Sequence, residues 1–164
     1  AMVRYIMSHH ERITQLTNQT PAEKMSQLLN SGTAVLDSTP PIKACLAAEQ
    51  AGGNILSYYQ ALIKAHFIDG LRIAEEETLV QIAAECGINI DDFQNAFNVL
   101  SEAAVVKHIN DSRILLQTIG GQGFPTFVLE QNGKLKMLNH QRLFNNPTGW
   151  QESLNDILIN ETIQ

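Results

Sequence analysis

The 164-residue sequence is short of charged side chains, of basic residues in particular, and of long apolar runs. Charged residues make up 17% of the chain, below the roughly 25% usual for soluble domains, and the net charge is −6. Because that surplus repels phosphate backbones, we expect no nucleic-acid partner. No apolar run approaches the roughly 18 residues of a membrane-spanning helix, and the first residues do not resemble a secretion signal. The sequence therefore predicts a cytoplasmic protein without a membrane partner.

Only two cysteines are present, Cys45 and Cys86, and both fall inside predicted helices. Their wide separation suits neither a disulfide framework nor a zinc site. Apolar surroundings raise a thiol pKa, so both are predicted to be structural, and no residue of the chain is predicted to be catalytic. The adjacent His9 and His10 point to different sides of a helix, so they cannot form a metal-binding pair and are expected on the surface. The sequence thus predicts neither a metal nor a cofactor.

What the chain has in quantity is hydrophobic residues, which at 44% are enough for one packed domain. Apolar side chains recur at helical spacing through most of the sequence, and prolines, glycines and capping residues separate the segments. Helices are expected over residues 5–16, 21–30, 40–51, 55–69, 76–86, 91–100 and 102–119. Gly120 and Gly121 end this helical region.

The pattern changes to strands at Phe124. The segments 124–130 and 134–138 flank Asn132-Gly133, a strong hairpin signal, and Asn146-Pro147 opens a final helix. Because both faces of the first strand are apolar, we expect it in the middle of a sheet. The additional strands of that sheet would come from a longer chain or from another chain, or helices would take their place. Pro125 marks the beginning of this strand, and a cis bond before it would cost only about 0.5–1 kcal/mol.

The order of these segments resembles that of DsbA-like thiol-disulfide oxidoreductases, in particular the protein-disulfide isomerase group related to FrnE. The stretches that carry the resemblance are Asp37-Ser38-Thr39-Pro40-Pro41, Ala65-His66-Phe67-Ile68-Asp69-Gly70-Leu71-Arg72-Ile73 and Gly121-Gln122-Gly123-Phe124-Pro125-Thr126-Phe127. The resemblance implies a mainly helical α/β chain with a thioredoxin-like fold. Residues 1–120 would form the helical insert domain, and residues 121–164 the C-terminal part of the thioredoxin-like domain.

The resemblance also implies a site. The family's cis-proline matches Pro125, and Gly123 and Phe124 would offer backbone to an extended peptide or to protein thiols and disulfides. His66 and Phe67 would help to wall the substrate groove. In the family, an opening strand, a Cys-x-x-Cys helix and a second strand come before the helical insert, and no such motif occurs in this chain. The chain is therefore expected to be inactive on its own.

Three functional hypotheses remain open. In the first, the chain is either part of a longer disulfide oxidoreductase or a naturally shortened member of that family. An in-frame Cys-x-x-Cys within roughly 50–70 residues before Met2 would support the longer protein. Alternatively it resembles the glutathione-using kappa-class transferases and 2-hydroxychromene-2-carboxylate isomerases, whose catalytic serine would also lie upstream. Thirdly, it is a non-enzymatic helical binding module that forms a homodimer through an exposed sheet edge.

Overall fold

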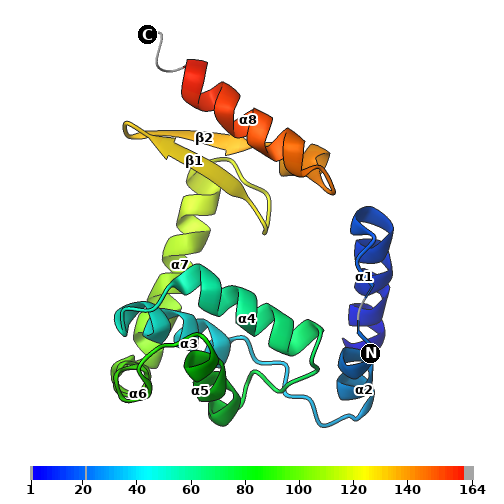
Figure 1. The fold of residues 1–164 in the computed structure, drawn as a ribbon, viewed down its shortest axis with the longest axis vertical. Helices are drawn as coiled ribbons and strands as arrows, with labels where there is room; N and C mark the ends of the chain where they lie inside the picture. The colour runs from blue at the N-terminus through cyan, green and yellow to red at the C-terminus, as the bar shows by residue number, and fades with distance from the viewer. Residues whose placement is uncertain (1, 21, 161–164) are drawn as a thin grey trace.

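The computed structural model describes residues 2–20 and 22–160 and is mainly helical (Figure 1). Seven helices come first in the described residues: α1 (Met2–Thr17), α2 (Glu23–Asn30), α3 (Thr39–Gln50), α4 (Ile55–Phe67), α5 (Glu76–Glu85), α6 (Ile90–Val99) and α7 (Glu102–Thr118). The strands β1 (Phe127–Gln131) and β2 (Lys134–Leu138), the 3-10 helix η1 (His140–Leu143) and α8 (Pro147–Asn160) follow. The predicted fold class and the predicted order of elements are confirmed.

Helices α3 to α6 pack around one apolar core. Tyr58 of α4 and Phe93 of α6 are fully buried, with ring centroids 5.8 Å apart. The Tyr58 hydroxyl donates a hydrogen bond of 3.0 Å to the carbonyl oxygen of Leu79 in α5. On α3, Ala44, Ala47 and Ala48 are buried, and such small side chains let neighbouring helices approach closely. These four helices form the base of the molecule (Figure 1).

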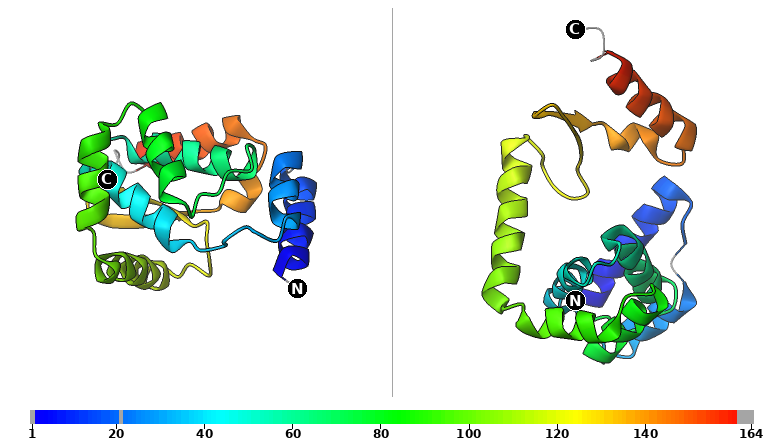
Figure 2. Two further views of the ribbon diagram at one scale, coloured as in Figure 1. Left: turned by 90° about the horizontal axis from the view of Figure 1, so that it is seen from below. Right: turned by 60° about the vertical axis from the view of Figure 1, so that its left-hand side comes forward.

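The hairpin is carried away from this base by α7 (Figures 1 and 2). Its two strands are antiparallel, with Phe127 opposite Leu138 and Gln131 opposite Lys134. Asn132 and Gly133 adopt positive φ angles of 51° and 74°, as a two-residue hairpin turn of this twist requires. α8 packs against the hairpin, where the rings of Phe127 and Trp150 meet edge to face at 5.2 Å.

Helices α1 and α2 lie on the other side of the molecule from α7 (Figures 1 and 2). Ile6 of α1 packs against a small cluster on α2 formed by Met25, Leu28 and Leu29. α2 in turn contacts the turn after α4, where Gly70 has a φ of +66°. A Cβ atom there would lie 2.6 Å from the carbonyl oxygen of Lys24, so the close approach requires glycine.

Two local expectations were wrong. The strand begins at Phe127 rather than at Phe124, because Thr126 turns back to donate its hydroxyl to the Gly123 carbonyl at 2.6 Å and Pro125 has no N–H for a ladder. In the described residues β1 pairs with β2 alone, so its expected place in the middle of a larger sheet stays a prediction. α2 begins at Glu23, with Ala22 at the N-cap, and Pro21 lies outside the described residues.

Two side chains also differ from expectation. Cys86 is the C-cap of α5 rather than an interior helical residue, although it is partly buried as predicted. His10 is not a surface residue: its side chain is only 6% exposed. It lies beside Phe67 of α4, with the ring centroids 6.0 Å apart, because α1 packs back onto the end of α4.

Candidate functional site

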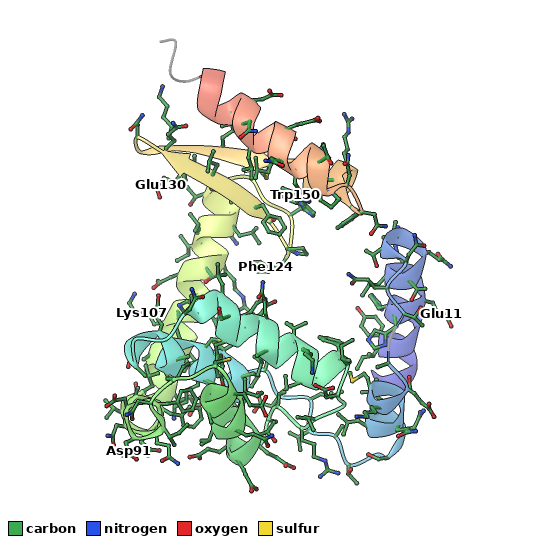
Figure 3. All side chains as sticks on the ribbon, viewed as in Figure 1. Glu11, Asp91, Lys107, Phe124, Glu130 and Trp150 are labelled. Atoms are coloured by element: carbon green, nitrogen blue, oxygen red, sulfur yellow. The ribbon has the colours of Figure 1, made fainter. Side chains whose placement is uncertain are left out.

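The segment that joins α7 to β1 is built from glycines and a cis-proline. The amides of Gly120 and Gly121 satisfy the last carbonyls of α7, with bonds of 3.0 Å to Gln117 and 2.8 Å to Leu116. Beyond this end, the peptide bond between Phe124 and Pro125 is cis. The Phe124 side chain is 69% exposed, and Figure 3 places it at the end of the hairpin nearest α4.

This segment lines a groove of about 920 Å³, within the range of roughly 300–1,000 Å³ typical of small-ligand sites. Its lining residues come from three parts of the chain: residues 120–126, residues 137–141 with Phe144, and Arg12 and Leu16 of α1. Asn145 donates a hydrogen bond of 3.4 Å to the Leu16 carbonyl, which ties the end of α1 to the hairpin side of the groove. The groove is therefore bounded by segments that lie far apart in sequence.

The charges around the groove favour an anion. Arg12 is the single formally charged side chain among its described lining residues, although the chain contains 17 acidic residues. His140 also lines the groove, between the rings of Phe127 and Phe144 at centroid distances of 5.5 Å and 5.9 Å. These aromatic contacts fix the imidazole against the hairpin. The groove offers exposed backbone, an aromatic ring at Phe124 and one cation, but no thiol.

The two cysteines lie elsewhere. Burial raises the pKa of the Cys45 thiol to about 11. Burial, followed by the nearby Glu85 carboxylate, also raises the pKa of Cys86, whose Sγ lies 3.9 Å from the Ser57 carbonyl oxygen. Both thiols are therefore protonated near neutral pH, and a protonated thiol is a poor nucleophile.

The predicted site residues fall into two groups. Gly123, Phe124 and Pro125 all line the groove, whereas His66 and Phe67 are absent from its lining. His66 lies at the end of α4, where its Nδ1 is 3.3 Å from the Leu71 carbonyl oxygen, and its ring meets Phe67 edge to face at 4.9 Å. The structure thus does not bring the two groups together in one pocket, and a substrate role for His66 and Phe67 stays a prediction.

Sequence reasoning missed the second wall of the groove. Arg12 and Leu16 are four residues apart on α1, so they share one helical face, but nothing in the sequence indicates that this face meets the segment around Phe124. The sequence also gives no sign that residues 137–140 line the groove, because their position depends on the direction in which the chain leaves β2.

The described residues contain no cluster of three or more His, Cys, Asp or Glu side chains placed to bind a metal ion. Among the helices of the same residues, none has the length and apolar character needed to cross a membrane.

Comparison with known proteins gives the chain a family. The family model for the DSBA-like thioredoxin domain matches residues 10–146. The cytosolic disulfide reductase DsbM from Pseudomonas aeruginosa is 38% identical, with a TM-score of 0.87 over 95% of this chain and 76% of DsbM. The structure of the same reductase with GSH gives 37% identity and a TM-score of 0.85, over 96% of this chain and 77% of that chain.

A more distant structure, of a candidate protein disulfide isomerase from Nitrosomonas europaea, shares the fold at 18% identity and a TM-score of 0.60. It matches over 83% of this chain and 64% of its own. None of the curated protein sequences matches this chain. The family model covers most of the chain. The chain belongs to the DSBA-like thioredoxin domain family.

Proposed function

We propose that this chain supplies the substrate-binding wall of a thiol-disulfide oxidoreductase. The observation that carries the proposal is that Gly123, Phe124 and Pro125 line one groove with α1, in a chain 38% identical to a disulfide reductase. The groove holds no cysteine among its described residues. The role of the chain is therefore to bind and orient a thiol or disulfide, and the reactive thiolate comes from a Cys-x-x-Cys segment that this sequence does not contain.

In that reaction the attacking thiolate breaks the substrate disulfide and forms a mixed disulfide with one of its sulfur atoms. The other sulfur leaves as a thiolate, and the second cysteine of the pair then displaces the first, which yields reduced substrate and an oxidised pair. The exposed backbone around Phe124 would bind the chain on either side of the substrate sulfur. Cys45 and Cys86 take no part, because their raised pKa values keep them protonated.

The surface of α4 supports the proposal that a further segment packs on this chain. Leu56, Tyr59, Ile63 and Phe67 recur every three or four residues along one helical face and are 69%, 51%, 38% and 37% exposed. A stripe of this kind marks an interaction surface. Its proposed occupant is a strand-helix-strand segment with Cys-x-x-Cys, because the family places one before the helical insert and because about a quarter of DsbM has no counterpart here.

Three finer points belong to the same proposal. Residues 1–120 act as the helical insert, and residues 121–164 complete the thioredoxin-like domain. The substrates are thiols or disulfides of proteins or of glutathione, since the DsbM structure with GSH is similar to this chain. The protein acts in the cytoplasm, as the description of DsbM as cytosolic supports. Homodimer formation stays a prediction.

The test is a titration of the isotope-labelled chain with oxidised glutathione, followed by amide NMR. We expect the largest shifts at residues 122–126 and 139–141, with small shifts in α3 and α5. As a control, a tripeptide with serine in place of cysteine reports how much of the binding depends on sulfur. Shifts confined to the base helices, or no shift at high ligand concentration, would exclude the groove as the substrate site.

A further inference from the structure

We propose that Arg12 is a specificity-determining residue that selects carboxylate-bearing thiol ligands for the groove. The inference rests on the proposed function, because it names the chemical class of substrate that the same groove accepts. It starts from the composition of the groove wall. In a chain of net charge −6, the described lining residues include one arginine and no Asp or Glu.

The position of Arg12 suits this role. It lies on α1, lines the same groove as the Gly123–Pro125 segment, and shares the lining face with Leu16 one helical turn later. Among the described residues, three ion pairs form: Lys64 with Asp69, Arg72 with Glu75 and Lys107 with Asp111. Arg12 belongs to none of them, so its five N–H donors are available to a ligand.

The expected ligand follows from this geometry. A guanidinium group binds a carboxylate with two parallel hydrogen bonds, and such charge-assisted bonds are stronger than neutral ones. A ligand whose sulfur lies beside Phe124 would need a carboxylate several bonds away to reach Arg12 on α1. Short acidic thiol peptides have this form, and glutathione, with a carboxylate at each end, is a suitable probe. Neutral or cationic thiol peptides would lack the contact.

The test measures the affinity of the chain for reduced glutathione and for its diethyl ester, in which both carboxylates are masked. Arg12→Gln removes the charge, and Arg12→Lys keeps the charge but loses the paired donors. Arg113→Gln is the matched control, because Arg113 is an exposed arginine of α7 outside the groove lining. Helical content and unfolding midpoint show whether each variant keeps the fold.

We expect Arg12→Gln to weaken glutathione binding about tenfold, as for the loss of one charge-assisted contact. Arg12→Lys should fall between, and Arg113→Gln should bind like the unchanged chain. The diester should bind weakly and should not respond to Arg12→Gln. Equal glutathione affinity of the Arg12→Gln and Arg113→Gln variants would overturn the role of Arg12 and leave the proposed function intact. If neither probe shifts the groove amides of any variant, both the inference and the proposed function fail.

Discussion

Replacing Gly70 with alanine should loosen the packing of α2, and with it α1, against the rest of the molecule. Gly70 has a φ of +66°, and an alanine in this left-handed region costs about 1–2 kcal/mol. The added Cβ would also lie 2.6 Å from the carbonyl oxygen of Lys24, well inside ordinary contact. The obstacle is helix backbone, so α2 has to retreat, and overpacking of this kind typically costs about 1–3 kcal/mol. Together these terms predict a loss of about 2–5 kcal/mol for Gly70→Ala.

Gly32→Ala is the matched control. Gly32 has almost the same φ, +69°, but a Cβ there would meet no atom within 4 Å. It should therefore lose only the conformational cost of about 1–2 kcal/mol, and the smaller entropy of unfolded alanine affects both variants alike. Urea unfolding, with midpoints and slopes compared, measures both losses. Equal destabilisation by the two substitutions would show that the approach of α2 to this turn is not tight, and that the placement of α1 described above is wrong.

Three further predictions concern single buried or partly buried groups. Tyr58→Phe should lower the free energy of unfolding by about 1 kcal/mol, because it removes the hydroxyl that donates to the Leu79 carbonyl. The control Tyr59→Phe, on an exposed ring, should change this free energy by less than about 0.5 kcal/mol, and equal effects of the two substitutions would show that the hydrogen bond does not stabilise the fold. Cys45, with a pKa of about 11, should react slowly with iodoacetamide at pH 7 and about tenfold faster for each added pH unit, as followed by mass spectrometry; rapid labelling at pH 7 would contradict its burial. Burial, and then the neighbouring His66 and His9, lower the pKa of His10, so the unfolded chain binds a proton at this residue at higher pH than the folded chain, and stability should fall as the pH drops below about 6.5. A His10→Phe variant should lose less stability than the unchanged chain between pH 7 and pH 5, and equal losses in the two proteins would refute this.

Local sequence signals were sufficient for most of the fold. Asn54 and Ser101 each cap a helix by accepting a backbone N–H bond, and such caps are readable without a structure. The Asn132-Gly133 turn likewise fixes the hairpin register from two residues. These elements were predictable because their determinants lie within a few residues of one another.

The errors arose where distant segments meet. Nothing in the sequence around His10 indicates that it is buried, and only the packing of α1 on α4 buries it. The start of β1 depends on the Thr126 hydroxyl, which competes with the ladder for local hydrogen bonds. Part of the groove lining was predicted, through Gly123, Phe124 and Pro125, because those residues carry the family pattern. Arg12 was not, since its role depends on the position of α1 in space rather than on a motif.

In the proposed role, this chain becomes a disulfide oxidoreductase once a Cys-x-x-Cys segment is packed against the Gly123–Pro125 segment and α4. The direct measurement joins the chain to a strand-helix-strand segment that carries a Cys-x-x-Cys pair, and follows reduction of insulin disulfides by a small thiol. The chain alone and a fusion with both added cysteines changed to serine are the controls, and amide NMR verifies that each fusion is folded. We expect turnover only for the fusion with intact cysteines. A folded fusion no faster than its serine control, or turnover by the chain alone, would contradict this role.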